Sequence, residues 1–130
     1  MKQLFFLGSS KDDISGFPDE VKTEIGFSLY LAQSGEMALN AVPLTGFGSA
    51  MVPEIIVNHM GDTYRSVYTV KFEYAVYVLH AFKKKSKSGI ATPKHQMDLV
   101  KRRLKLADAH HKARFAHQIE RKKNVGTQGR

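Results

Sequence analysis

Apolar residues recur at helical spacing in two long segments of the chain. The first segment begins at Pro18, is followed by two acidic residues that suit the positive end of a helix, and ends at Ser34 before a glycine. A second stripe of the same period follows Thr92-Pro93. We therefore predict one helix from about Pro18 to Ser34 and another that begins at Thr92-Pro93. Ser10, with Asp13 three residues later, fits a capping box that opens a short helical turn.

Strand-like runs lie on both sides of the first predicted helix. Leu4–Leu7 is a short apolar run near the start of the chain. Val52–Val57, Tyr64–Phe72 and Tyr74–Phe82 follow one another with only short turn signals between them, which predicts antiparallel neighbours. The segment Ala75–Leu79 is apolar at every position, as expected of a central strand.

This order of elements predicts an α+β fold with a small antiparallel sheet and its helices packed on one side. The stretch between Glu36 and Ala50 is rich in Gly, Pro, Ser and Thr, and we interpret it as a loop. We assign residues 1–107 to one domain and residues 108–130 to a basic C-terminal extension, partly helical or disordered. Within the extension, Asn124–Arg130 is expected to fray.

The length and composition narrow the class of protein. A chain of 130 residues suits one domain with one core, and 42% hydrophobic residues are typical of a folded protein. The absence of cysteine excludes disulfides, thiolate metal sites and a cysteine nucleophile, and it suits a reducing compartment. No apolar run approaches the ~20 residues of a membrane span. We therefore expect a cytoplasmic protein without a membrane segment.

The formal net charge of +8 is unevenly distributed along the chain. Residues 1–60 contain three lysines and seven acidic residues, a net charge of −4, whereas residues 61–130 contain 17 Lys and Arg and five acidic residues, a net charge of +12. A positive excess confined to one half most often attracts a polyanion such as nucleic acid, anionic lipid or an acidic partner. Strict alternation along Tyr64–Phe72 places Arg65 and Lys71 on one face, which predicts a cationic face on the sheet.

Four groups of residues together resemble a known protein family. They are Leu44-Thr45-Gly46-Phe47-Gly48, the run from Gly61 to Val70 with its Tyr64-Arg65-Ser66-Val67-Tyr68 core, the run from Val76 to Ser86 with its Leu79-His80-Ala81-Phe82-Lys83-Lys84 end, and Thr92-Pro93 with Arg103-Leu104. Over about Phe6 to Ala107 the chain resembles the phage-associated, HigB-like branch of the RelE/ParE toxin superfamily. The resemblance implies a RelE-like fold and the toxin of a type II toxin-antitoxin pair. It also implies cleavage of messenger RNA on the ribosome, and a helix-turn-helix antitoxin as partner.

The residues are compatible with RNA cleavage that needs no metal or cofactor. Such a reaction requires a base for the 2′-hydroxyl, cations around the phosphate and an acid for the leaving 5′-oxygen. Arg65 is the candidate for the phosphate, because a guanidinium can bind two phosphate oxygens; the alternative is an arginine paired with an acid such as Glu54 or Asp62. His80 lies near the end of the central strand and titrates near neutrality, although a packed strand histidine is an equal interpretation.

The cations that follow His80 have two possible roles. Lys83 and Lys84 are candidates for catalysis, because an ammonium among other cations loses its proton more readily; the alternative is a solvated loop that contacts phosphate. Further contacts to RNA are predicted at other cationic positions, namely Lys71, Lys85, Lys87, Arg102 and Arg103. For the two arginines, ion pairs on a helix surface are the commoner outcome.

Aromatic and histidine side chains offer further interpretations. Four tyrosines could stack on bases, although strand spacing favours core packing: Tyr64, Tyr68, Tyr74 and Tyr77. A catalytic tyrosine that several RelE relatives have after the basic loop is missing at Ser88–Ala91. The histidines His110, His111 and His117 suggest a polar tail more than a metal site, because carboxylates and cysteines at ligand spacing are missing.

Two other functions remain open at this point. A ParE-like toxin that poisons gyrase would share the fold without RNA chemistry, although His80 and the lysines argue against it. A non-catalytic RNA-binding phage regulator would use the same basic surface without turnover.

Overall fold

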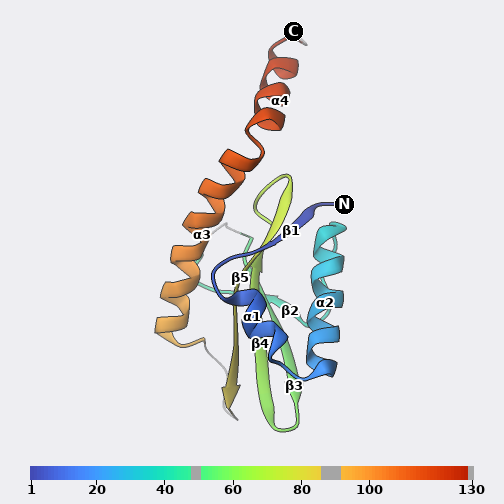
Figure 1. Ribbon diagram of the computed structural model, residues 1–130, viewed down its shortest axis with the longest axis vertical. Coiled ribbons are helices and arrows are strands. Elements are labelled where there is room, and N and C mark those ends of the chain that lie inside the picture. Colours follow the sequence, from blue (N-terminus) through green and yellow to red (C-terminus); the bar gives the residue numbers. More distant parts are fainter. Residues whose placement is uncertain (48–50, 86–91, 129–130) are drawn as a thin grey trace.

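A computed structural model describes residues 1–47, 51–85 and 92–128 as a sheet with helices around it (Figure 1). In chain order the elements are β1 (Gln3–Phe6), α1 (Ser10–Ser15), α2 (Asp19–Gln33), β2 (Ala41–Pro43), β3 (Pro53–His59), β4 (Asp62–Thr69), β5 (Ala75–Lys85), α3 (Lys94–Arg114) and α4 (Ala116–Gln128). The five strands lie in the order β1-β5-β4-β3-β2. The α+β class is therefore confirmed, as are the two long helices and the three consecutive strands.

The sheet is mixed, so the prediction of an antiparallel sheet is wrong. β3, β4 and β5 are antiparallel neighbours, as their short connections predict, but β1 runs parallel to β5 with Leu4 opposite Val76. The turn between β3 and β4 has positive φ at Met60 (51°) and Gly61 (83°), the conformation of a tight hairpin turn. β2 lies inside the predicted loop and pairs with β3. Pairings between distant segments are the ones that local patterns do not predict.

Helices cover both faces of the sheet, so the prediction of helices on one side is also wrong. On one face Val76 and Val78 of β5 pack in a cluster with Ile25 and other residues of α2. On the other face Tyr77 and Leu79 pack in a second cluster with Val100 and Ala107 of α3. Figure 1 shows α2 and α3 on opposite sides of the strands. A central strand that is apolar on both faces needs a cover on each face, which is the physical reason for this arrangement.

The short helix α1 begins at Ser10, but not through the predicted capping box. The Ser10 hydroxyl is buried and donates to the carbonyl oxygen of Val78 at 3.4 Å, so it ties the helix to the sheet. It is the preceding Ser9 whose hydroxyl contacts Asp13 Oδ2, at 2.8 Å. The capping-box prediction is therefore wrong: Ser9 is the N-cap residue, and its hydroxyl makes no hydrogen bond to the helix backbone.

The C-terminal segment is helical as far as Gln128. α3 runs past residue 107, where we expect the domain to end, and a change of direction at Phe115 separates it from α4. His111 and Phe115 are buried against the sheet, and Lys122 of α4 forms an ion pair with Glu73. Beyond this contact α4 extends away from the sheet (Figure 1). In the part of the chain that the structure describes, no helix has the length and apolar character needed to cross a membrane.

Candidate functional site

An irregularity in β5 decides where His80 lies. Val67 of β4 is opposite His80, but the next residue, Tyr68, is opposite Val78, so Leu79 has no partner across the strand pair. Such a bulge places two successive side chains on one side of the sheet. Leu79 packs in the cluster beneath α3, and His80 contacts α3 as well. Strict alternation would have placed His80 on the α2 face.

His80 is held between two side chains of α3. One ring nitrogen, Nδ1, lies 3.3 Å from Arg103 Nη1, and the other, Nε2, is hydrogen-bonded to Gln96 Oε1. A guanidinium can only donate, so Nδ1 accepts and Nε2 carries the proton that it donates to the amide oxygen. The surrounding contacts therefore select one tautomer of a neutral imidazole. Only 6% of the His80 surface is exposed.

The environment of His80 favours the neutral ring. Burial is the main cause that lowers its pKa from the ordinary value of 6.5, and the positive charge of Arg103 lowers it further. The Gln96 hydrogen bond and the negative charge of Asp13 act in the opposite direction. The net shift is downward, so His80 is unprotonated near neutral pH, which is the state that a general base needs.

Arg103 faces the sheet instead of solvent. Besides His80, its Nη1 donates to the carbonyl oxygen of Leu79 at 3.0 Å, and burial lowers the pKa of the guanidinium. A Cβ added at Gly8, whose φ is +56°, would lie 2.5 Å from Arg103 Cζ, so the guanidinium rests directly on the glycine backbone. Arg103 therefore holds His80 in this structure, and it is half-buried at the sheet instead of lying on an open helix surface. Arg102, by contrast, is exposed.

Arg65 is buried in an ion pair. Its Nη1 lies 2.9 Å from Glu54 Oε1, and the two residues are 3% and 2% exposed. The other oxygen of Glu54 accepts a hydrogen bond from Thr92 Oγ1 at 2.9 Å, just before α3 begins. Pairing with Glu54, the alternative left open above, is what the structure shows. Because its charge is matched and its surface closed, Arg65 does not present a phosphate-binding guanidinium, and the predicted cationic face is wrong.

The two candidate lysines lie on opposite faces of β5. Lys83 is opposite Tyr64 and sits over its ring on the α2 face, 5.8 Å from the ring centroid, and it pairs with Asp62 at 3.1 Å. The hydrogen bond to Asp62 is the main cause that raises the pKa of Lys83, the opposite of the lowered pKa expected for a base. Lys84 is one residue further along the strand, opposite Thr63, and its place on the strand puts it on the α3 face with His80.

Among the other predicted RNA contacts, the side chain of Lys71 is described by the structure. Lys71 is exposed and follows the end of β4, so it does not share a strand face with Arg65; its Nζ lies 5.6 Å from the Phe72 ring centroid. The side chain of Lys85 and all of Lys87 lie outside the described residues.

One histidine of the C-terminal segment, His111, belongs to the core, so the prediction of a polar tail is wrong for it, whereas His110 is exposed. His111 is buried and accepts a hydrogen bond from the backbone N–H of Tyr74 at 3.2 Å, and burial lowers its pKa. His110 Nδ1 lies 2.7 Å from the Tyr77 hydroxyl. Tyr64, Tyr68 and Tyr77 are buried, which confirms the packing interpretation for them.

Among the described residues, no group of three or more His, Asp and Glu is arranged to hold a metal ion.

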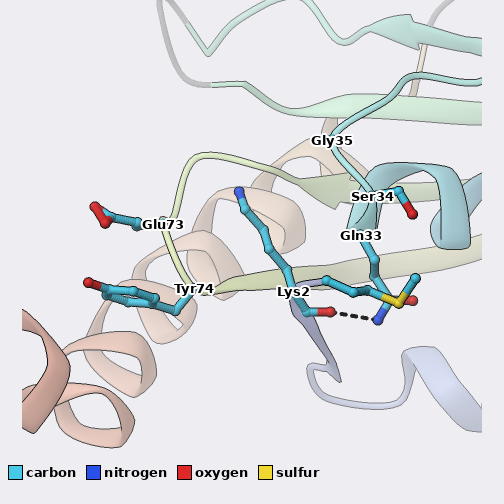
Figure 2. Close-up of a pocket in the computed structure, with 7 residues that line it drawn as sticks. Lys2, Gln33, Ser34, Gly35, Glu73 and Tyr74 are labelled. Carbon is cyan, nitrogen blue, oxygen red and sulfur yellow. Dashed lines mark hydrogen bonds between the residues drawn. The ribbon is translucent and has the colours of Figure 1, made fainter.

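A cleft of about 590 Å³ lies at the other end of β5 (Figure 2). Its lining includes Lys2, Gln33, Glu73 and Tyr74. Gln33 Nε2 donates to the Lys2 carbonyl at 2.7 Å, and Lys2 Nζ donates to the Phe72 carbonyl at 2.9 Å. These polar groups join β1, α2 and the turn before β5. The cleft therefore lies where these three segments meet, and it is about 20 Å along the strand from His80 at ~3.3 Å per residue.

Sequence reasoning missed two of the residues around His80. Gln96 carries a weak signal, because it lies seven residues before Arg103 and therefore shares a face of the same helix. In the sequence, Gly8 indicates only the end of a strand, because its close approach to Arg103 depends on the tertiary structure. Neither residue stands out by type.

Comparison with known proteins assigns the class and then the family. The family described as "Phage derived protein Gp49-like (DUF891)" matches residues 12–105, more than two thirds of the chain, and it is a RelE-like, toxin-related family. The chain belongs to the Gp49-like family. The resemblance to the RelE-like toxin superfamily is thereby confirmed, and the chain falls in the class of toxins from toxin-antitoxin pairs.

The chain was also compared with solved structures and with curated proteins. The crystal structure of the isolated E. coli RelE toxin, P21 form, matches with a TM-score of 0.49 and 22% sequence identity, over 78% of this chain and 98% of that chain. A search of curated proteins found no significant match.

Proposed function

We propose that the protein is a toxin that cuts messenger RNA on the ribosome, without a metal, and that a cognate helix-turn-helix antitoxin restrains it. The observation that carries this proposal is the neutral His80, held by Gln96 and Arg103 on the same strand face as Lys84. Membership of a RelE-like toxin family supports the substrate class. A chain of this family with a buried, neutral histidine near a cationic strand end is suited to acid–base chemistry on RNA.

In this mechanism His80 is the general base. Arg103 moves from His80 Nδ1 to the scissile phosphate, and Nδ1 then takes the proton of the 2′-hydroxyl. The 2′-oxygen forms a bond to phosphorus, the bond to the 5′-oxygen breaks, and the products are a 2′,3′-cyclic phosphate and a 5′-hydroxyl. Lys84 supplies positive charge to the phosphate and the proton for the 5′-oxygen. The pair of Arg65 and Glu54 acts as a positioning element, because Glu54 binds Thr92 immediately before α3.

A purified translation system with 5′-end mapping of the transcript tests the proposal. His80→Ala should reduce cleavage by about 10²- to 10⁴-fold, the range for loss of an acid–base group. Lys84→Ala should reduce cleavage strongly, whereas the matched Lys83→Ala, on the opposite face, should reduce it little. Cleavage by wild type should also decline at acidic pH, as His80 becomes protonated.

Other outcomes would overturn the proposal in different ways. Intact transcripts with ribosomes present, together with inhibition of gyrase supercoiling, would identify a ParE-like activity. Intact transcripts with RNA binding that His80→Ala leaves unchanged would identify a non-catalytic RNA-binding protein. Equal effects of Lys83→Ala and Lys84→Ala would contradict the proposal that the RNA is cut on the α3 face of the sheet.

A further inference from the structure

The outer face of α3 carries a straight row of lysines. Lys94, Lys101, Lys105 and Lys112 are separated by seven, four and seven residues, and all four are exposed. At 3.6 residues per turn these positions lie within about 20° of one line along the helix. The row is about 27 Å long, at ~1.5 Å per residue. We call these four residues, with the exposed Arg102 beside them, the lysine row.

Much of the charge of the lysine row is unmatched. Lys94 pairs with Asp98 at 3.2 Å and Lys112 with Asp108 at 3.0 Å, and such exposed pairs compete weakly with a polyanion. Lys101, Arg102 and Lys105 form no ion pair with any residue that the structure describes. Residues 94–128 together contain ten Lys and Arg against three acidic residues, a net charge of +7, so α3 and α4 account for most of the excess of +8.

The lysine row is separate from the site at His80. Arg103, which binds His80, and Val100, which is fully buried, lie on the inner face of α3. A helix with side chains is about 10–12 Å across, so the lysine row and His80 are separated by the width of α3.

Folded RNA fits the lysine row better than a lipid surface or an unpaired strand does. The inner side of α3 already packs on the sheet through Val100, Ala107 and His111, and the exposed Leu106 by itself does not make the broad apolar face that a membrane surface requires. α3 contains no Phe, Tyr or Trp, so it lacks the stacking platform that single-strand binders use. Lysines in a straight row match the phosphates of a double-helical backbone, which is recognised by shape and charge.

We propose that the lysine row binds the phosphate backbone of a folded, double-helical RNA, independently of its sequence. This inference rests on the proposed function for the choice of RNA. It assigns α3 two roles on its two faces: the inner face positions His80, and the outer face anchors the protein to structured RNA while a separate strand is cut.

Fluorescence anisotropy with a labelled 20-base-pair RNA duplex of arbitrary sequence tests the proposal. Lys101→Ala with Lys105→Ala should weaken binding at least tenfold at low salt and reduce the slope of log K against log[salt] by about 1.8, as expected for two lost phosphate contacts to a duplex. The control, Lys11→Ala with Lys22→Ala, removes the same charge from the acidic half of the chain, and should leave both quantities close to wild type.

The outcomes separate this inference from the proposed function. Equal affinities for the row variant and the control variant would overturn the inference, as would vesicles rich in phosphatidylserine that bind the protein as tightly as the duplex does. His80→Ala should bind the duplex normally, so loss of cleavage in that variant bears on the proposed function alone. Normal duplex binding through the row in a protein that cuts no transcript would uphold the inference and reject the catalytic proposal.

Discussion

The two faces of the sheet are built differently. On the α2 face, apolar side chains such as Ile25, Ile55 and Tyr68 are buried to 3% exposure or less. The α3 face also has an apolar cluster, with Tyr77 and Leu79, but it buries charged and titratable groups as well, among them Arg65 of β4 and His80 of β5. Burial of a charged group lowers stability unless a partner satisfies it, so the buried Glu54, Arg65 and His80 indicate that this face is adapted for chemistry as well as for packing.

Among the variants that test this difference between the two faces, Glu54→Gln is expected to have the largest effect on stability. Glu54→Gln leaves a buried guanidinium without its counter-charge, which should lower the free energy of unfolding by about 3–5 kcal/mol. Denaturant unfolding of the purified variants measures the loss. The double variant Glu54→Leu with Arg65→Met should recover most of it. A loss below 1 kcal/mol for Glu54→Gln alone would show that the α3 face does not depend on this pair.

Ile25 tests the α2 face by the same measurement. Ile25→Ala removes a fully buried side chain between α2 and the sheet, and should lower the free energy of unfolding by about 2–5 kcal/mol. Because Ile25 lies in the cluster on the α2 face, whereas Gln96 and Arg103 hold His80 on the α3 face, cleavage per folded molecule should stay near wild type. A drop in cleavage that exceeds the unfolded fraction would contradict the division of roles between the faces.

Gly8 tests how closely the backbone approaches Arg103. Gly8→Ala introduces a Cβ at φ +56° against the guanidinium, and should lower the free energy of unfolding by about 1–3 kcal/mol. Displacement of Arg103 should also change His80, so NMR titration of the His80 ring should give a different pKa in the variant. Gly26→Ala is the control, because it lies in α2 with nothing within 4 Å of the added carbon. An unchanged His80 titration would show that Arg103 does not depend on Gly8.

The pH dependence of stability gives the smallest effect. Burial lowers the pKa of both His80 and His111 below 6.5, so the unfolded chain binds protons at these positions at higher pH than the folded chain does. Stability should therefore be full above about pH 7 and should fall as the pH decreases through 6.5 toward the lowered values. Urea midpoints between about pH 7.5 and pH 5.5 measure the loss. His111→Gln, which keeps an acceptor for the backbone N–H of Tyr74, should reduce this loss of stability. An unchanged loss would contradict a contribution from His111.

Local patterns predicted the parts of the fold that are themselves local. The helix at Asp19–Gln33 and the β3–β4–β5 meander depend on periodicity and on short turns, and both were predicted to within a few residues. The parallel pairing of β1 with β5 joins residues some 70 positions apart, for which no spacing in the sequence gives a sign. The placement of α3 on the second face could have been predicted, because the central strand is apolar on both sides and therefore needs a cover on each.

The candidate site was predicted only in part, for a related reason. His80 was found because its residue type and its place at a strand end are visible in the sequence. Its face was not, because the bulge at Leu79 reverses the alternation that local reasoning assumes. Arg65 was assigned to an open surface because its burial depends on Glu54, a residue of another strand.

The sequence by itself determined the periods of the elements, the concentration of positive charge in the second half and the presence of one histidine among strand-end cations. These are properties of neighbouring residues, so they can be derived from order alone. The tertiary structure decided which of the cations are matched, which lysine shares a face with His80, and that this imidazole is neutral. Burial and charge pairing are set by segments distant in sequence, and the free energy of a proton on His80 depends on what those segments place around it.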